Sequence, residues 1–345
     1  MPYEPPPDPR SARRSAIGRW VSFALAVILV VLVAYLGYVG FQGSAQVAEP
    51  PAPSKDCRTP GLAYGWVYEA INYDAASDAA LADLPNPGNC PGPGAPAGQR
   101  VQTADRVELA GWYIPAGNGS GPTGPTVVLA HGHGANKSTM LGYADVLHAD
   151  YNVVIFDFRN HGQSSGSQTT AGVAEQDDLR AVIDWVDANK EPEQIAVLGS
   201  SMGGAASLNE AVEDLNVDAL ILDSTHATLA NALQARLENA GYPLSLPGSW
   251  SILLGSLLRT GQDISAADPV QQIGLFDRPV LIIVGGQDAS IGDQDGQDLL
   301  AAAQAGDTPA ELMVCADAGH GGPLETCRGD YRDWVLGFLA RSLAQ

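Results

Sequence analysis

Residues 199–203 (GSSMG) have the types and spacing of a site for nucleophilic catalysis. They follow an apolar run at residues 195–198 and precede a stretch of helical character at residues 203–215. In a strand–turn–helix context, Gly-x-Ser-x-Gly forms a sharp turn that exposes the central serine, and the two glycines, Gly199 and Gly203, leave room for that turn. The following helix directs its positive end at the site, where negative charge develops. Ser201 is therefore the predicted nucleophile.

A serine hydroxyl needs a base that takes its proton and a carboxylate that orients the base. After this kind of turn the expected chain order is Ser, then Asp or Glu, then His. Asp288 ends an apolar segment and His320 follows the last predicted strand, so both lie where ligands bind in open α/β sheets. Asp293 and Asp295 are rival acids, but they are more typical of a helix start. His226 is a rival base, yet it precedes every candidate acid, so we prefer His320.

The oxyanion that forms on attack needs two fixed N–H donors, each contributing about 3–4 kcal/mol. Met202 directly follows the nucleophile and supplies one backbone N–H. The second donor is expected in the loop at residues 131–134 (HGHG), where Gly132 permits close backbone approach. His133 is the predicted donor.

Histidines near this loop raise the alternative of a metal site. The sequence around His131, His133 and His161 offers neither a carboxylate nor a cysteine with metal-ligand spacing. We therefore predict no metal, and no cofactor is indicated. Residues 157–164 (DFRNHGQS) are interpreted as a structural turn braced by Asp157 and Arg159.

Apolar runs that alternate with helical stretches must position these residues. The predicted strands are residues 107–113, 126–129, 152–156, 194–198, 219–222, 278–284 and 311–314, and the predicted helices are residues 138–149, 172–189, 203–215 and 294–305. Near-continuous Val/Ile/Leu strands between helices are typical of a parallel sheet covered on both faces. The fold class is therefore α/β.

A long insertion interrupts this alternation between residues 223 and 279. It contains two helical stretches, residues 229–240 and 249–258, with exposed-looking apolar positions. These positions are Trp250, Ile252, Leu253 and Leu257. Connections of this length are usually functional. We interpret residues 226–275 as a lid over the site, with a structural excursion as the alternative.

The N-terminal part has the pattern of a membrane anchor. Residues 21–39 carry no charge, and 19 residues at about 1.5 Å each span roughly 28 Å, close to the thickness of a bilayer core. Arg13, Arg14 and Arg19 precede this run, which places residues 1–19 in the cytoplasm and the remainder outside the cell membrane. A signal peptide cleaved near residues 43–45 (GSA) is the alternative, but the run is longer than a usual signal sequence. We predict a single transmembrane helix at residues 20–41.

Composition excludes two classes of protein and supports export. With 45% hydrophobic residues the chain can bury a core, and a net charge of −21 excludes a general nucleic-acid-binding surface. Residues 1–20 carry a net charge of +2, so the remainder carries −23.

Residues 42–100 form a Pro/Gly-rich lead-in, and residues 101–345 form the catalytic domain. The four cysteines allow three pairings, of which we favour the local ones, in an oxidising compartment. The local pairs are Cys57–Cys90 and Cys315–Cys327.

These motifs resemble the α/β-hydrolase superfamily over residues 105–340. The HG loop, the DxRxHGxS stretch, GxSxG, GxxD and GH occur in the family's order. The chain looks most like the Bem46-type and serine-aminopeptidase-like (S33) group. The resemblance implies an eight-stranded, mostly parallel sheet with a lid between strands six and seven, and hydrolysis through an acyl-enzyme. Ser201, Asp288 and His320 match the triad positions, and His133 and Met202 match the oxyanion-hole positions. Residues 43–100 have no counterpart in the family's core.

The expected function is that of an exported, membrane-anchored serine hydrolase that cleaves carboxylic esters or thioesters. Its partners would be a small acyl substrate and, through the N-terminal helix, the membrane. A serine peptidase or aminopeptidase, or an acyltransferase, would use the same triad. A binding protein on a hydrolase fold would usually lack a triad member, and all three are present here.

Overall fold

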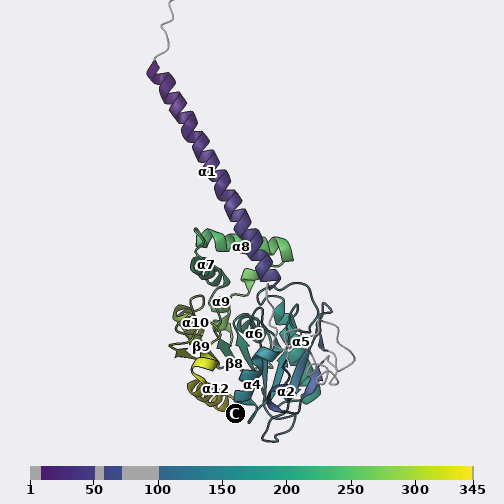
Figure 1. Cartoon of the computed structure of the whole chain (residues 1–345). Coiled ribbons are helices and arrows are strands. Elements are labelled where there is room, and N and C mark those ends of the chain that lie inside the picture. Colours follow the sequence, from purple (N-terminus) through teal and green to yellow (C-terminus); the bar gives the residue numbers. More distant parts are fainter. Residues whose placement is uncertain (1–8, 51–57, 72–100, 344–345) are drawn as a thin grey trace, which may run out of the picture.

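The computed structural model describes residues 9–50, 58–71 and 101–343 (Figure 1). The helices are α1 (Pro9–Ala48), α2 (Pro60–Tyr64), α4 (Leu141–Leu147), α5 (Glu175–Lys190), α6 (Met202–Glu213), α7 (Leu229–Asn239), α8 (Ser245–Thr260), α9 (Pro269–Gln272), α10 (Asp293–Ala305), α11 (Pro323–Thr326) and α12 (Arg328–Ser342). The strands are β1 (Glu69–Ile71), β2 (Val101–Gln102), β3 (Glu108–Leu109), β4 (Gly111–Ile114), β5 (Thr126–Ala130), β6 (Asn152–Phe156), β7 (Ile195–Ser200), β8 (Ala219–Asp223), β9 (Val280–Gly285) and β10 (Ala310–Cys315). Short 3-10 helices are η1 (Lys137–Met140), η2 (Ile264–Ala266) and η3 (Ile273–Leu275).

Eight strands form one sheet in the order β1-β4-β6-β5-β7-β8-β9-β10. The six strands from β6 to β10 in this order are mutually parallel, and β4 is antiparallel to both β6 and β1. The expected eight-stranded, mostly parallel sheet is confirmed. Because parallel strands end at the same edge, the loops after β5, β7, β9 and β10 meet there.

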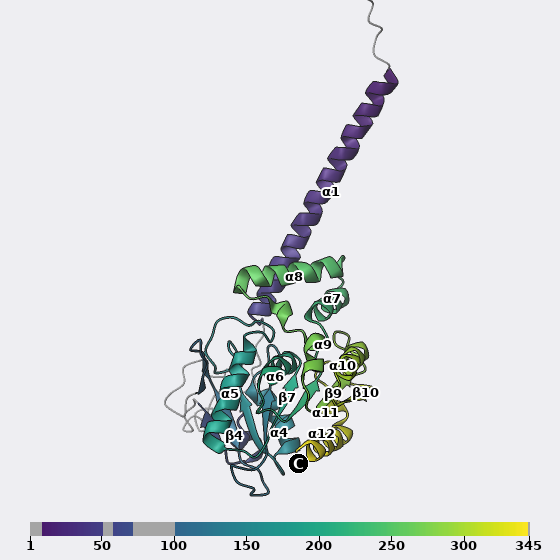
Figure 2. The same cartoon turned by 180° about the vertical axis from the view of Figure 1, so that it is seen from behind.

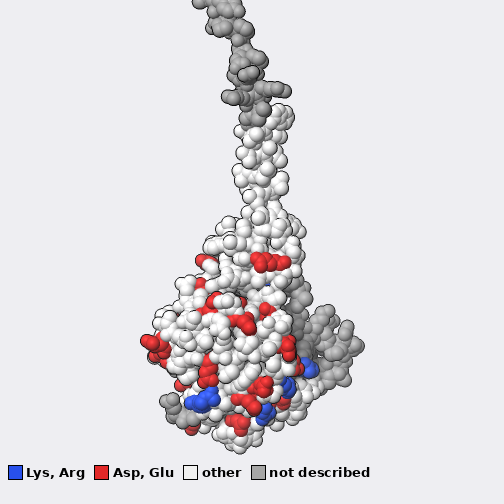
Figure 3. Space-filling view, turned by 90° about the vertical axis from the view of Figure 1, so that its left-hand side faces the viewer, with Lys and Arg blue, Asp and Glu red and all other residues white. Residues whose placement is uncertain are grey.

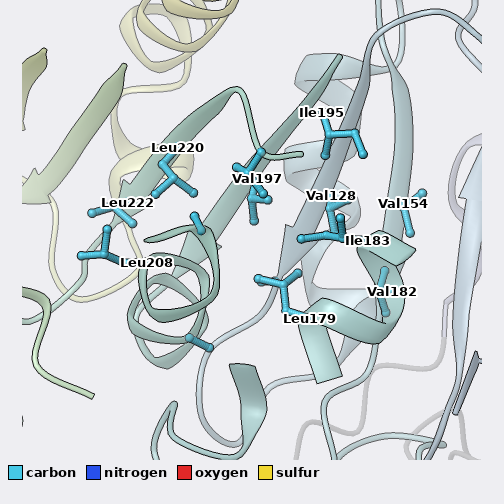
Figure 4. Close-up of a cluster of buried hydrophobic side chains, with 14 of the residues drawn as sticks. Val128, Val154, Leu179, Val182, Ile183, Ile195, Val197, Leu208, Leu220 and Leu222 are labelled. Carbon is cyan, nitrogen blue, oxygen red and sulfur yellow. The ribbon is translucent and has the colours of Figure 1, made fainter. Parts of the chain in front are cut away.

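The sheet is buried on both faces because neighbouring residues of each strand point to opposite sides. In β5, Val128 joins a cluster with residues of α5 and α6, whereas Val127 and Leu129 join a cluster with residues of α4 and α12. Figure 4 shows the first cluster, in which Leu179 and Ile183 of α5 lie against the strands. This layered core fixes the strand ends on which the site is built.

The predicted strand at residues 107–113 is wrong, because the chain forms two strands there. β3 pairs with β2 in a separate small sheet, and β4 joins the large one. At Ala110, between them, the backbone N–H donates to the Ser164 hydroxyl at 2.9 Å rather than to a strand. The predicted helix at residues 138–149 is likewise two elements, η1 and α4.

The predicted lead-in contributes to the sheet. β1 pairs with β4, and Glu69 in β1 forms an ion pair with Lys190 of α5 at 2.6 Å. This three-residue strand was not predicted as part of the core. Cys57, Cys90 and most of the lead-in lie outside the described residues.

Helix α1 has 40 residues and projects from the body (Figures 1 and 2). Its segment Arg19–Ala48 contains an 18-residue stretch with a mean hydropathy of 2.5, so by length and composition it is able to cross a membrane. The helix continues beyond the predicted span at residues 20–41, and residues 43–45 lie inside it. On the face seen in Figure 3, no charged side chain is visible on the white part of the projecting helix, whereas acidic residues are spread over the body.

The insertion between β8 and β9 forms the helices α7, α8 and α9, which stand above the sheet edge. Trp250 and Leu257 of α8 are exposed as expected, but Ile252 is buried. Ile252 packs with Val39 of α1 and with Leu233 and Leu237 of α7. The end of α1 and the insertion therefore share a small core, and we call α1, α7 and α8 together the lid–anchor unit.

Candidate active site

Ser201 lies in the turn between β7 and α6. Its backbone has φ 53° and ψ −116°, a strained conformation that is held by the hydrogen bond from its N–H to the Asp223 carbonyl at 2.8 Å. A Cβ atom at Gly199 would lie 2.5 Å from the Gly203 carbonyl oxygen, and one at Gly203 would collide with the Ala130 carbonyl. The turn therefore requires glycine on both sides of the serine.

The three predicted triad residues lie together at this edge of the sheet. The His320 Nε2 atom is 3.1 Å from the Ser201 hydroxyl oxygen, and its Nδ1 atom is 2.7 Å from Asp288 Oδ2. Asp288 follows β9 and His320 follows β10, so the ends of three strands place the three groups. The distances are those needed for proton transfer from the hydroxyl to the imidazole.

The environment of Asp288 favours its charged form. Burial alone would raise the pKa of Asp288, but hydrogen bonds from His320 and from the backbone N–H groups of Ser290 and Ile291 outweigh it. The pKa therefore lies below the ordinary value. The rival acid Asp295 instead accepts the backbone N–H groups of Ala227 and Gly292. Asp293, the other rival, is the first residue of α10.

His226, the rival base, lies near Ser201 but is not hydrogen-bonded to it. It is buried, and burial together with the charge of Arg236 lowers its pKa to about 4. Its Nε2 atom has no hydrogen-bond partner among the described residues. It also lines the cavity that contains Ser201. His226 is thus a neutral imidazole beside the site, whereas His320 contacts both Ser201 and Asp288.

The two predicted oxyanion donors flank Ser201. Met202 begins α6, and His133 lines the same cavity as Ser201 and Met202. Within the described part of the chain, neither backbone N–H is used in a hydrogen bond. A Cβ atom at Gly132 would lie 3.4 Å from the Ser201 Cβ atom, which shows how close this loop comes to the nucleophile.

Buried polar contacts hold the loop after β5 in place. The His131 Nε2 atom accepts the Phe158 N–H at 3.1 Å, and the His161 Nε2 atom accepts the Gly134 N–H at 3.1 Å. Burial, followed by the nearby His161, lowers the pKa of His131 to about 3, so this ring is neutral. These histidines thus act as hydrogen-bond acceptors for the backbone.

The stretch after β6 braces this loop. Asp157 is ion-paired with Lys137 and accepts the Lys137 N–H at 2.7 Å. Arg159 is paired with Asp178 of α5 at 2.7 Å and with Asp105 at 2.9 Å. The structure thus gives both Asp157 and Arg159 structural contacts.

A buried network below Ser201 was missed by the sequence reasoning. Asp223, at the end of β8, accepts hydrogen bonds from Ser224, Tyr143 and Tyr331 at 2.8, 3.2 and 2.9 Å. Burial raises the pKa of Asp223. The Ser224 hydroxyl in turn accepts the Gly321 N–H at 3.2 Å, next to the base. The sequence signal that could have indicated Asp223 is its position at the end of a buried apolar strand.

The loop that carries His320 is closed at its base. A disulfide joins Cys315, the last residue of β10, to Cys327, which directly precedes α12. This is the local pairing that the sequence favoured. The bridge and the Gly321–Ser224 hydrogen bond limit the movement of the His320 loop.

A cavity of about 40 Å³ adjoins the nucleophile. It is lined by Val47, His133, Ala171, Ser201, Met202, His226, Leu229, Ala232, Leu233, Arg236 and Ile291. Most of these side chains are apolar, which suits an acyl group. Val47 belongs to α1, and no feature of the sequence indicated that this helix reaches the site.

Comparisons with known proteins identify relatives of the chain. The sequence profile of the alpha/beta hydrolase family matches residues 127–334. An uncharacterized protein of Mycobacterium tuberculosis is 30% identical over 233 residues, which cover 66% of this chain and 74% of the relative. The uncharacterized protein YfhR of Escherichia coli is 28% identical over 246 residues, covering 69% and 78%. Protein bem46 of Schizosaccharomyces pombe is 27% identical over 150 residues, covering 42% and 49%.

A solved structure shares the fold. An esterase of Pyrococcus furiosus superposes with a TM-score of 0.65 at 22% identity, covering 86% of this chain and 98% of that protein.

Proposed function

Because the chain belongs to the α/β-hydrolase family, we propose that it is an exported, membrane-anchored serine hydrolase that cleaves carboxylic esters or thioesters. The observation that carries this proposal is the continuous hydrogen-bonded arrangement of Asp288, His320 and Ser201 at one sheet edge. Family membership supports a hydrolase activity in general. The apolar cavity beside Ser201 supports an acyl group as the part of the substrate that is bound.

In the proposed reaction, Ser201 Oγ attacks the acyl carbon while its proton passes to His320 Nε2. The carbonyl oxygen becomes an oxyanion, which the backbone N–H groups of His133 and Met202 stabilise. The intermediate collapses, the bond to the alcohol or thiol breaks, and His320 returns the proton to that leaving group. Water then attacks the acyl-enzyme with His320 again as base, which releases the carboxylic acid and restores Ser201.

Asp288 supports both steps without giving up its charge. Its pKa lies below the ordinary value, so it stays a carboxylate and stabilises the imidazolium form of His320. The hydrogen bond at 2.7 Å also fixes the Nδ1 proton, which leaves Nε2 free to accept the proton of Ser201.

The proposed location follows from α1. Residues 1–19 would be a cytoplasmic tail, residues 20–41 the membrane span, and the catalytic domain would lie outside. The arginines before the span and the apolar character of Arg19–Ala48 support this orientation. The disulfide between Cys315 and Cys327 supports an oxidising compartment.

Labelling with a fluorophosphonate tests the nucleophile. The full chain in detergent should be labelled, Ser201→Ala should not, and the adjacent Ser200→Ala should keep its labelling. Esters, thioesters and aminoacyl amides with a common acyl group then define the bond that is cleaved. Equal labelling of wild type and folded Ser201→Ala, or cleavage of amides alone, would contradict the proposal.

A further inference from the structure

The end of α1 is packed tightly into the lid. A Cβ atom at Gly40 would lie 2.5 Å from the Ser251 carbonyl oxygen of α8, and one at Gly43 would lie 2.5 Å from Ile252. Larger side chains at either glycine would separate the two helices. The contact between α1 and α8 is therefore a specific interface rather than a loose tether.

The same helix end reaches the catalytic loops. The Val47 carbonyl lies 2.8 Å from the His133 Nε2 atom. The Ala48 carbonyl accepts the Asn160 Nδ2 atom at 3.1 Å and the Thr169 N–H at 2.9 Å. Helix α1, which contains the predicted membrane span, thus also contacts the loop expected to supply an oxyanion donor.

A second cavity lies beside this region. It has a volume of about 160 Å³, lies between α1 and α7, and has the exposed Tyr242 among its lining residues. Four residues, Val47, His133, Leu233 and Arg236, line both this cavity and the one at Ser201. The two cavities are therefore neighbours, one at the flank of α1 and one at the nucleophile, separated by side chains that line both.

One face of α8 is apolar and exposed. Leu246, Trp250, Leu254 and Leu258 recur every four residues and are 51%, 63%, 58% and 79% exposed. This spacing places them on one side of the helix, whereas Ile252 points toward α1 and α7. The only charged residue of α8 is Arg259, whose guanidinium donates to the Phe41 carbonyl of α1.

The position of α8 along α1 coincides with the predicted edge of the membrane. An apolar groove of about 610 Å³ runs between the two helices from Val33 to Ser44 of α1. The predicted span ends at residue 41. The groove therefore overlaps residues 33–41 of that span, which correspond to about 12 Å along the helix axis at 1.5 Å per residue. Figures 1 and 2 show α8 running across α1, as a helix in the plane of a membrane would.

We propose that α8 lies in the outer boundary of the bilayer spanned by α1, and that the cavity between α1 and α7 admits the acyl chain of a bilayer ester to Ser201. The substrate class would thus be acyl esters that reside in the membrane. This inference rests on the proposed function, since it assigns the route and the substrate class to the same nucleophile.

The bilayer is the occupant that the surroundings of α8 favour. The exposed stripe is continuous with the uncharged flank of α1, which the predicted span places in lipid. Leucines with one tryptophan at the boundary are typical of helices that lie in a membrane interface. A bound partner protein would instead need its own apolar strip at membrane level.

Paired substrates with the same leaving group test the route. The full chain is reconstituted in phosphatidylcholine vesicles, and hydrolysis of vesicle-bound 4-methylumbelliferyl oleate is divided by that of aqueous 4-methylumbelliferyl acetate. Ala240→Trp places an indole at the exposed rim of the cavity between α1 and α7. Ala340→Trp, on an exposed position of α12, is the matched control.

We expect the oleate-to-acetate ratio to fall at least tenfold in Ala240→Trp and to stay within twofold in Ala340→Trp. An unchanged ratio in Ala240→Trp, or a wild type that cleaves acetate but not oleate, would overturn the proposed route and leave the hydrolase intact. Activity on neither ester, or activity unchanged in Ser201→Ala, would instead overturn the proposed function.

Fluorescence quenching tests the position of α8 independently of activity. Spin-labelled lipids should quench part of the tryptophan emission of the reconstituted chain, and Trp250→Phe should remove a component that Trp334→Phe, in α12, leaves in place. Equal quenching in both variants would show that α8 lies outside the bilayer and would contradict the proposal. If a soluble protein partner covered α8, adding that partner would protect Trp250 from aqueous acrylamide instead.

Discussion

The body of the molecule, which is the eight-stranded sheet with the helices that cover it, and the lid–anchor unit place the same types of apolar side chain in opposite surroundings. In the body, strand residues such as Leu220 are 0% exposed between two layers of helices. In the lid–anchor unit, Leu258 is 79% exposed, and the described buried cluster consists of Val39, Leu233, Leu237 and Ile252 alone. The body completes its core with its own layers, whereas the lid–anchor unit leaves large apolar side chains exposed along α1 and α8.

The largest effect is expected where the body alone performs chemistry. Asp288→Asn should lower kcat/KM by about 10⁴-fold, about 5.5 kcal/mol of transition-state stabilisation, because the amide no longer fixes the His320 tautomer. Asp293→Asn, an exposed position at the start of α10, should change kcat/KM by less than about threefold. A loss in Asp288→Asn below about tenfold would remove Asp288 from the triad.

Removal of a leucine from the body should cost stability. Leu220→Ala should lower the free energy of unfolding by about 2–5 kcal/mol, because it leaves a cavity in a closed core. Denaturant unfolding of the full chain in detergent, followed by circular dichroism, measures the change. A cost below about 1 kcal/mol would mean that the sheet core is less tightly packed than described.

Two buried neutral histidines of the body should each contribute less stability in acid. Burial keeps the folded-state pKa of His131 at about 3 and that of His226 at about 4, whereas an unfolded histidine titrates near 6.5. Below pH 6.5 each of these histidines therefore binds more protons in the unfolded chain than in the folded one, and its contribution to stability falls as the pH falls. Each histidine should contribute a loss of about 2 kcal/mol between pH 6.5 and 5.

Unfolding curves at these two pH values measure this loss, and His226→Gln should reduce it by about 2 kcal/mol. A pH dependence identical to that of the wild type would show that His226 is not buried as a neutral ring.

The smallest effect is expected on the exposed face of α8. Leu258→Ala should change the free energy of unfolding in detergent by less than about 0.5 kcal/mol, because this side chain has little protein around it. The contrast with Leu220→Ala is the direct measure of the difference between the two regions. A cost near that of Leu220→Ala would show that a protein contact covers this face.

The sequence predicted the parts of the site that depend on local rules. Ser201 was found because its turn demands glycine on both sides, and Asp288 and His320 because parallel strands end at one edge. β1 was missed, since three residues are too short to show a strand period. Asp223 was missed because its importance comes from Tyr143 and Tyr331, which lie 80 and 108 residues away in sequence. The reach of α1 to His133 was also unpredictable, because an apolar helix indicates its length but not its neighbours.

The contact of the Val47 carbonyl with His133 determines which part of α1 would stay with the catalytic domain after a proteolytic cut in this helix. A protease that cut between the predicted span and the catalytic domain would separate the two. Here a cut at residues 43–45 would fall within α1, where Ser44 is 1% exposed. It would leave Val47 in the wall of the cavity at Ser201 but remove Val39, which packs against α7 and α8. The released domain would therefore keep its triad and lose most of the α1 wall of the cavity between α1 and α7.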